Sequence, residues 1–119
     1  MRIAISALGT TLDAPIDDRF GRAAHLLLVE TTTMAVGDID NTANQQALKG
    51  AGLGAAESVS RAGAEAVITG HLGPNAFKAL RAAGIPGYGI TSMSVREAVE
   101  LFVADKLDLL SEGESNAGM

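Results

Sequence analysis

The order in which apolar runs and amphipathic segments follow one another is the feature that most constrains the fold of this chain. Short apolar runs, several of them rich in β-branched residues, are typical of strands and occupy residues 2–8, 24–30, 34–39, 66–69 and 85–90. Segments whose apolar residues recur at helical spacing occupy residues 53–63, 74–84 and 94–102. The predicted order is β-β-β-α-β-α-β-α, and such an alternation is typical of the α/β class.

Short connections and right-handed crossovers restrict how these elements assemble. We predict a mixed five-stranded sheet in the order 3-2-1-4-5, with strand 2 antiparallel to the others and helices packed on the sheet. This strand order resembles the three-layer ribonuclease H-like folds. A chain of 119 residues is long enough to bury one core, so we predict a single domain over residues 1–110. The polar residues 111–119 are predicted to form a disordered tail.

The predicted topology brings four loops to one edge of the sheet. These loops are residues 9–22, 40–52, 70–74 and 91–94. The edge carries the carboxyl ends of the parallel strands, where open α/β sheets bind their ligands. We therefore expect the functional residues of this chain to lie in these loops.

One of the loops contains a glycine pattern close to that of dinucleotide-binding proteins. The stretch KGAGLGAAES, residues 49–58, has Gly50, Gly52 and Ala55 at the spacing G-x-G-x-x-A. A dinucleotide loop needs a strand directly before the glycines and an acidic residue about 20 positions later, and the sequence has neither. Two interpretations stay open. The glycines let the following helix approach the sheet, or the amides ahead of that helix bind a different anion.

Cationic and donor residues in the same loops favour an anionic ligand. Arg19 and Arg22 lie in the first loop, Lys49 lies beside the glycines, and His71 follows the fourth predicted strand. The chain as a whole has a net charge of −5 and a pI near 4.8, so it lacks the basic surface of a general nucleic-acid binder. Any anion is therefore held by a local arrangement of donors.

Other residues qualify this interpretation. Asp13, Asp17 and Asp18 share the first loop and oppose anion binding unless they point away from the ligand. Arg19 is expected to pair with one of them. His25 alternates with apolar residues at the start of a strand, so we expect it to be structural.

Composition excludes several classes of function. The sequence contains no Cys, which removes thiolate nucleophiles and Cys-ligated zinc or iron–sulfur sites. It contains no serine-centred elbow and no HExxH motif, and its first strand lacks the carboxylates with which ribonuclease H-like nucleases hold Mg²⁺. We therefore expect no enzymatic activity.

The sequence also bears on location. No apolar run approaches the roughly 20 residues of a membrane span, and the stretch MRIAIS leads directly into a strand pattern instead of a signal peptide. We expect a cytoplasmic protein that binds neither nucleic acid nor membranes.

Three stretches of the sequence carry a family resemblance. They are RFGRA (residues 19–23), GAGLGAA (residues 50–56) and GHLGPNAF (residues 70–77). Together with the similarity that extends from Met1 to about Leu110, they resemble the dinitrogenase iron–molybdenum cofactor biosynthesis family, the NifX and NifB-C-terminal-like domains. The resemblance implies a ribonuclease H-like fold and a non-enzymatic carrier of a metal–sulfur cofactor.

The resemblance also implies the kind of cofactor. One Cys-free member of the family holds a mixed molybdenum–copper sulfide cluster without covalent attachment, and the same cluster is expected here. Partner proteins for delivery or complex assembly are expected as well. Without Cys, the sulfides of the cluster itself must complete the coordination of the metals, and the single candidate protein ligand is His71.

The cofactor-binding residues predicted from the loops and the resemblance supply N–H donors, positive charge and apolar cover. Met93 has an alternative interpretation as an ordinary core or loop residue. The predicted set is Arg19, Phe20, Gly21, Arg22, Asn44, Lys49, Gly50, Gly52, His71, Leu72, Gly73 and Met93.

Two other functions stay open on the sequence alone. The same loops can bind a partner protein, with any metal incidental, which makes the chain a small adaptor. A protein-binding surface is expected to expose an apolar patch, and these loops contain few large apolar residues. The other alternative is a sensor for a nucleotide or an oxyanion.

Overall fold

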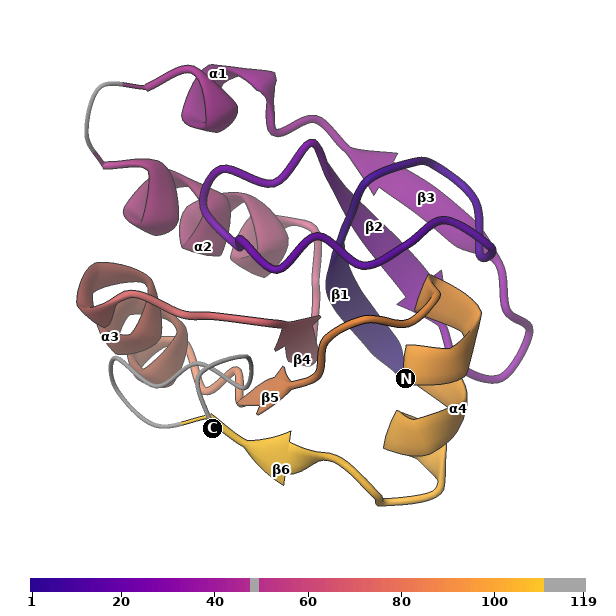
Figure 1. Ribbon diagram of the computed structural model, residues 1–119. Helices are drawn as coiled ribbons and strands as arrows, with labels where there is room; N and C mark the ends of the chain where they lie inside the picture. Colours follow the sequence, from indigo (N-terminus) through magenta and orange to yellow (C-terminus); the bar gives the residue numbers. More distant parts are fainter. Residues whose placement is uncertain (48–49, 111–119) are drawn as a thin grey trace.

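The computed structural model describes residues 1–47 and 50–110, in which six strands form one sheet and four helices pack around it (Figure 1). The strands are β1 (Arg2–Ala7), β2 (His25–Glu30), β3 (Val36–Ile39), β4 (Ala66–Thr69), β5 (Gly87–Gly89) and β6 (Asp108–Leu109). The helices are α1 (Thr42–Gln45), α2 (Ala51–Arg61), α3 (Pro74–Ala82) and α4 (Val95–Val103).

The strands are arranged in the order β3-β2-β1-β4-β5-β6. The central strand β1 pairs antiparallel with β2, with Ile5 opposite Leu27, and parallel with β4, with Ile3 opposite Ala66. The predicted order 3-2-1-4-5 and the antiparallel strand 2 are confirmed, but the sheet has a sixth strand. β6 pairs antiparallel with β5 and has only two residues, too few for an alternating pattern to reveal it.

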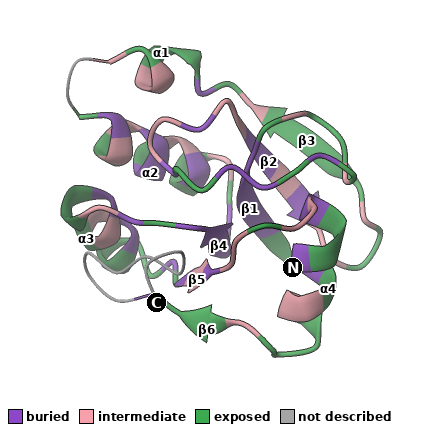
Figure 2. Ribbon diagram, in the orientation of Figure 1, coloured by how far each residue is buried: buried purple, intermediate pink, exposed green. Residues whose placement is uncertain are grey.

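Each face of the sheet carries its own apolar core, because successive side chains of a strand point to opposite faces. Ile3 and Ile5 of β1 join the core beneath α4, whereas Ala4 between them joins the core beneath α2 and α3. Figure 1 shows α2 and α3 on one side of the sheet and α4 on the other. The buried residues concentrate on the central strands and on the inner sides of these helices, whereas β3 and β6 are mainly exposed (Figure 2). The predicted three-layer α/β architecture is confirmed.

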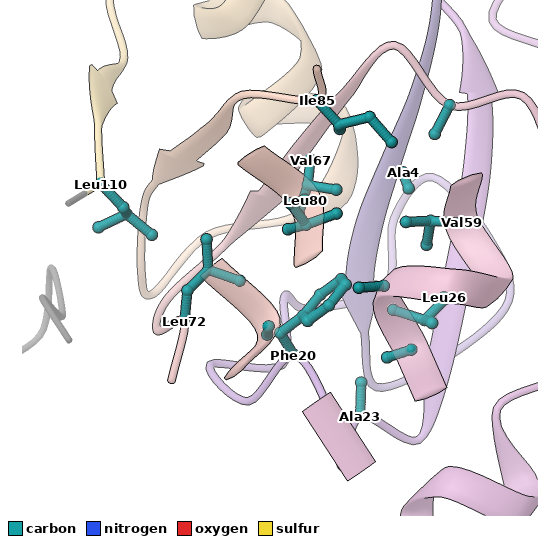
Figure 3. Packing of buried hydrophobic residues seen from close by; sticks show 14 residues of the cluster. Ala4, Phe20, Ala23, Leu26, Val59, Val67, Leu72, Leu80, Ile85 and Leu110 are labelled. Carbon is teal, nitrogen blue, oxygen red and sulfur yellow. The ribbon is translucent and has the colours of Figure 1, made fainter. Parts of the chain in front are cut away.

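The core beneath α2 and α3 includes one aromatic ring from the loop after β1. Phe20 is 2% exposed and lies among side chains that include Leu26, Leu72 and Leu80 (Figure 3). Burying a phenylalanine side chain stabilises a protein by about 2 kcal/mol. Phe20 therefore attaches the long loop between β1 and β2 to the core.

Local sequence explains where the main helices begin and end. α4 begins with the predicted capping box: Ser94 Oγ accepts the Glu97 N–H at 3.1 Å, and Glu97 Oε1 accepts the Ser94 N–H at 3.2 Å. α2 and α3 are each followed by a glycine in the left-handed region, Gly63 with φ 85° and Gly84 with φ 74°. No helix in the described part of the chain has both the length and the apolar character to span a bilayer.

The start of α2 differs from the prediction. The helix begins at Ala51, two residues earlier than predicted, so Gly52 lies inside its first turn and not in the preceding loop. Its N-cap is Gly50, with φ 82°. Glycine has a low helix propensity, which hid the first two residues of the helix in the sequence. At Gly54 the absence of a side chain makes room for Asn44, because an added Cβ would overlap the Asn44 amide.

The four-residue helix α1 was not predicted either. Its residues are polar and have no apolar stripe, and the segment was predicted to be a loop. The side chain of Asp40 accepts the Thr42 N–H at 3.0 Å, which stabilises the first turn.

Candidate functional site

The loops at the carboxyl edge of the central strands are joined to one another. The loop between β1 and β2 forms a parallel bridge with the loop after β4, at Arg19 and His71. It forms a second, antiparallel bridge with the residue before α4, at Pro15 and Ser94. Segments far apart in the sequence therefore meet at the edge where the topology predicts a ligand site.

Asp17 fastens the first loop to the central strands. Its N–H donates to the Ser6 carbonyl at 3.0 Å, and its carbonyl accepts from Ser6 Oγ at 2.6 Å. Ser6 Oγ also lies 2.7 Å from Thr69 Oγ1 in β4. A hydroxyl has one proton, so Thr69 donates the proton of this second bond. All three side chains are buried, and the network joins the loop to β1 and β4 together.

The first loop also packs directly on the start of α2. A Cβ added to Gly21 would lie 2.9 Å from the carbonyl carbon of Ala51 and still closer to Gly52, so only glycine permits this approach. Asn41, which is 2% exposed, donates through Nδ2 to the carbonyls of Gly21 at 3.1 Å and Ala23 at 3.0 Å. These contacts hold the loop in a fixed position against the helix.

A pocket of about 350 Å³ lies where these segments meet. Its wall comes from the first loop, the first turn of α2, and the loop and first turn that begin α3. The lining residues are Arg19, Phe20, Gly21, Arg22, Ala51, Gly52, His71, Gly73, Pro74, Asn75 and Ala76.

Most of the predicted binding residues lie together in this wall. They come from three separate segments of the sequence, and the fold brings them to one place. Their role as ligand contacts stays a prediction. The predicted residues that line the pocket are Arg19, Phe20, Gly21, Arg22, Gly52, His71 and Gly73.

Leu72 and Met93 were predicted to cover the ligand, and the structure places both elsewhere. Leu72 is 1% exposed and lies in the core beneath α3. Met93 packs against the core on the α4 side of the sheet, whereas the pocket lies on the side of α2 and α3. The alternative interpretation of Met93 as an ordinary packing residue therefore describes its surroundings better.

The remaining predicted residues come from the segment before α2. Asn44 does not line the pocket; its Nδ2 donates to Asn41 Oδ1 at 3.0 Å. Gly50 is exposed at the N-cap of α2 and is not in the described wall. Gly52 lines the pocket as part of the helix. Lys49 lies outside the described residues.

Arg19 pairs with an aspartate of its own loop, as predicted. Its Nε and Nη2 donate to Oδ1 and Oδ2 of Asp17, each at 3.1 Å. The Asp17 side chain is 4% exposed and the Arg19 side chain 59% exposed. The carboxylate therefore lies inside the loop while the guanidinium reaches the pocket wall.

Arg22 connects the first loop to the segment that follows α1. Its Nη1 donates to the carbonyl of Gln45 at 3.2 Å and to that of Ala47 at 2.6 Å. Arg22 thus joins the pocket wall to the segment that follows α1.

The Asp17 carboxyl has a pKa below its ordinary value. Burial raises this pKa, but the hydrogen bonds from the Arg19 side chain and from the amides of Arg19 and Ala24 lower it, and together they outweigh the burial. The same contact raises the pKa of the Arg19 guanidinium. The pair is therefore ionised at neutral pH.

The other two aspartates of the loop are engaged elsewhere. Asp13 Oδ1 accepts from Arg96 Nε at 3.2 Å, and Asp18 Oδ1 accepts from Thr91 Oγ1 at 2.8 Å. Neither residue lines the pocket. These two carboxylates are therefore not placed to repel an anion in the pocket.

Sequence reasoning missed the part of the wall that comes from the first helical turns. Asn75 and Ala76 follow Pro74 at the start of α3. Pro74 has no N–H, but the amides of the next two residues have no acceptor within the helix. The signal was present, because a proline after GHLG marks the first helical position. Ala51 was missed because α2 begins earlier than predicted.

Gly73 is a glycine that neither conformation nor packing requires. It is the N-cap of α3, with φ −71° and ψ 168°, and no side chain caps the helix there. Among the described residues, no atom lies within 4 Å of a Cβ built on it. Serine, threonine, asparagine or aspartate is strongly preferred at such a position. Gly73 also lines the pocket.

The side chains do not form a site for a bare metal ion. Across residues 1–47 and 50–110, no three His, Cys, Asp or Glu side chains gather in a suitable way, and the whole sequence has no Cys. His71 is the one imidazole in the described pocket wall. The donor chemistry suits an anion that brings its own metal ligands.

A second hollow of about 340 Å³ lies between α3 and the β5–β6 edge of the sheet. Its described lining is mainly apolar and includes Leu72, Leu80 and Leu110, with Arg81 as its one charged residue. It lacks the converging amides and guanidinium groups of the pocket at the loops. The pocket at the loops is therefore the candidate site.

Comparison with known proteins agrees with the resemblance seen in the sequence. Residues 1–105 match the protein family described as "Dinitrogenase iron-molybdenum cofactor". The apo form of the orange protein from Desulfovibrio gigas is 40% identical, with a TM-score of 0.92 and 96% of each chain covered. A Thermotoga protein described as NifB-related is 30% identical, with a TM-score of 0.81, and the match covers 95% of this chain and 96% of that one. An uncharacterized protein of Methanocaldococcus jannaschii is 29% identical over 102 residues, which are 79% of this chain and 86% of the relative.

Proposed function

We propose that this chain, which belongs to the dinitrogenase iron–molybdenum cofactor family, carries a molybdenum-containing metal–sulfur cluster. The cluster is cargo, held non-covalently in the pocket between the first loop and the starts of α2 and α3. We expect a mixed molybdenum–copper sulfide, and partner proteins that deliver or receive it. The similar orange protein structure is described as an apo form, which implies that the orange protein takes a ligand.

The donors of the pocket support an anionic cargo. Arg19 and Arg22 line one side, and the first turns of α2 and α3 line the other. First-turn amides have no intrahelical acceptors, and the helix dipole favours negative charge there. Sulfide atoms on the surface of a cluster are acceptors without protons, so they match a wall made of donors.

The single observation that carries the proposal is this convergence of two helix starts and two arginines on one pocket. Helix N-termini and arginines occur on most protein surfaces. Here they meet across segments that begin near residues 19, 51 and 73, and no aspartate or glutamate shares the described lining. The arrangement is costly for a cation and favourable for an anion.

Gly73 supports a ligand that comes close to the backbone. A capping side chain at this position would stabilise α3, yet the residue is glycine and the space in front of it is open. A bulky cluster needs that space. Neither the backbone conformation at Gly73 nor its described neighbours require glycine.

The rest of the lining suits a polarisable, weakly hydrated surface. Phe20, Ala51 and Ala76 contribute carbon atoms between the donors. A volume of about 350 Å³ is at the lower end of the range for small-molecule sites, about 300 to 1,000 Å³. A compact inorganic cluster fits this size.

Metal content and colour test the proposal most directly. Protein purified without oxygen is analysed for molybdenum and copper, and the metal-free protein is then mixed with tetrathiomolybdate and copper(I) and desalted. We expect stoichiometric molybdenum and a visible absorption that stays with the protein. A colourless protein that takes up no metal would exclude the carrier function and favour the protein-binding adaptor.

Two double variants then test the location of the cargo. Replacing Arg22 and His71 together, by Arg22→Gln and His71→Gln, is expected to reduce cluster affinity at least tenfold, because charge-assisted hydrogen bonds contribute about 1.5 to 3 kcal/mol each. The matched control is Arg96→Gln with His25→Gln, which changes the same residue types outside the pocket. Equal affinity in the two double variants would place the cluster elsewhere.

A further inference from the structure

The carboxylate of Asp17 is fully occupied by donors of its own loop. Oδ1 accepts from the Arg19 N–H at 3.0 Å and from Arg19 Nε at 3.1 Å. Oδ2 accepts from Arg19 Nη2 and from the Ala24 N–H, each at 3.1 Å. The side chain is 4% exposed. One buried carboxylate therefore fixes both the path of the loop and the side chain of Arg19.

The position of this carboxylate is fixed relative to the sheet. The main chain of Asp17 makes two hydrogen bonds to Ser6 of β1, at 2.6 and 3.0 Å. The main chain of Arg19 is in turn bridged to His71. Arg19 is thus held at its main chain by the bridge to His71 and at its guanidinium by Asp17. Both contacts connect it to the central strands.

The bidentate contact leaves one side of the guanidinium for a ligand. Of its five N–H donors, Asp17 takes one on Nε and one on Nη2, so three remain. The Arg19 side chain is 59% exposed and lines the pocket. The carboxylate cancels the net charge of the pair, so Arg19 contributes through the direction of its donors, which a planar fork keeps fixed.

From these contacts we infer that Asp17 is a positioning residue, which holds the Arg19 guanidinium at the pocket wall so that its three remaining N–H donors bind the anionic cargo. This inference rests on the proposed function. If Asp17 served only to fix the path of the loop, the hydrogen bonds from the amides of Arg19 and Ala24 would be sufficient. The two additional bonds to Nε and Nη2 orient a side chain whose remaining donors reach the pocket.

A double-mutant cycle tests the inference, with tetrathiomolybdate and copper(I) as the probe. The proteins are the wild type, Asp17→Asn, Arg19→Gln and the double variant, and the dissociation constant of the cluster is measured for each. We expect each single variant to bind about tenfold more weakly, the effect of losing one charge-assisted contact of about 1.4 kcal/mol. The double variant is expected to bind no more than about twofold more weakly than Arg19→Gln alone, because the two residues act through one contact.

Two controls separate positioning from folding. Asp18→Asn removes the same charge from the adjacent residue, which bonds Thr91 and not Arg19, and it is expected to leave affinity within about twofold, since exposed polar contacts contribute little. Arg19→Lys keeps the charge but not the fork, and it is expected to bind as weakly as Arg19→Gln. If Asp17→Asn folds poorly, all variants are compared in trimethylamine N-oxide, which stabilises compact states.

The outcomes distinguish the inference from the function it rests on. A further tenfold loss when Asp17→Asn is added to Arg19→Gln would show a structural role and overturn the positioning role alone. If Arg19→Gln bound the cluster as tightly as the wild type, the positioning role would also be overturned, because Arg19 would then contribute nothing to binding. A wild-type protein that takes up no cluster would overturn the proposed function and the inference together.

Discussion

A Cβ added to Gly21 would lie 2.6 Å from the backbone nitrogen of Gly52 and 2.8 Å from its Cα. The loop after β1 and the first turn of α2 are therefore in backbone contact, and this contact forms one corner of the candidate pocket. The two glycines have different surroundings. Gly21 has no room for a side chain, whereas a Cβ on Gly52 would meet the Cβ of Ala76 at 3.1 Å, a close contact that only a small shift between α2 and α3 can relieve.

Replacing Gly21 by alanine is expected to destabilise the protein by about 1 to 3 kcal/mol, the range for overpacking a close contact. The reason is that the new methyl group meets backbone atoms, which cannot rotate away. Urea unfolding measures the change. The control is Gly37→Ala in β3, where the nearest atom to an added Cβ is 4.0 Å away. If both variants were equally stable, the approach of the loop to α2 would be looser than the structure has it.

Replacing Gly73 by serine is expected to separate stability from binding. The backbone at this N-cap is already extended, so the serine hydroxyl can cap α3 and stabilise the protein by up to about 1 kcal/mol. The same side chain enters the pocket and weakens cluster binding. Thermal unfolding and cluster titration of one sample measure both effects. A variant that gains stability and keeps full affinity would show that the cargo does not approach Gly73.

Replacing Ser94 by alanine is expected to lower stability and to leave cluster binding unchanged. It removes the capping box of α4 and lowers the free energy of unfolding by about 1 kcal/mol. Ser94 lies outside the described pocket lining, so the dissociation constant of the cluster is expected to stay unchanged at a temperature where the variant is folded. This variant also shows whether a loss of stability by itself reduces binding.

The lowered pKa of Asp17 predicts how stability depends on pH. Because the folded-state pKa lies below the unfolded value near 3.8, the stabilisation is fully present above that value and is lost as the pH falls through the folded pKa. The difference in free energy of unfolding between the wild type and Asp17→Asn is therefore expected to be constant at pH 6 to 7 and to shrink below about pH 4. Urea unfolding at pH 7 and pH 3 measures it.

The control for this pH dependence is Asp13→Asn. Asp13 carries the same charge in the same loop, but its side chain is 79% exposed and pairs with the exposed Arg96. Exposed pairs contribute between 0 and about 1 kcal/mol, so this variant is expected to stay close to the wild type at pH 7. A difference between wild type and Asp17→Asn that persists unchanged at pH 3 would contradict the assignment to the Asp17 carboxylate.

The sequence predicted the strand order because apolar periodicity and chain connectivity leave few arrangements. It missed β6 because two residues cannot show an alternation, and it missed the start of α2 because Gly52 is a poor helix former. In the first case the sequence pattern is too short, and in the second a glycine contradicts the helical pattern. A contact between elements explains Gly54, because Asn44 occupies the space that a side chain there would need.

The sequence predicted the candidate site to the extent that strand order determines which residues lie at one edge of the sheet. Arg19, Arg22 and His71 were expected at one edge, and the structure brings them to one pocket. Side-chain direction was not predictable: Leu72 follows His71 directly but points into the core. The partners of the aspartates were only partly predictable, because Asp13 and Asp18 find theirs in Arg96 and Thr91, more than 70 positions away.

The attachment of the loop between β1 and β2 has a consequence for the thermodynamics of capture. Asp17 ties the middle of this loop to Ser6, and Phe20 is held in the core. Fixing the backbone of one residue takes about 1 to 2 kcal/mol of conformational entropy, and here that entropy is lost during folding. An arriving ligand meets a preorganised surface, so association needs no slow rearrangement and residence time depends on the contacts it makes.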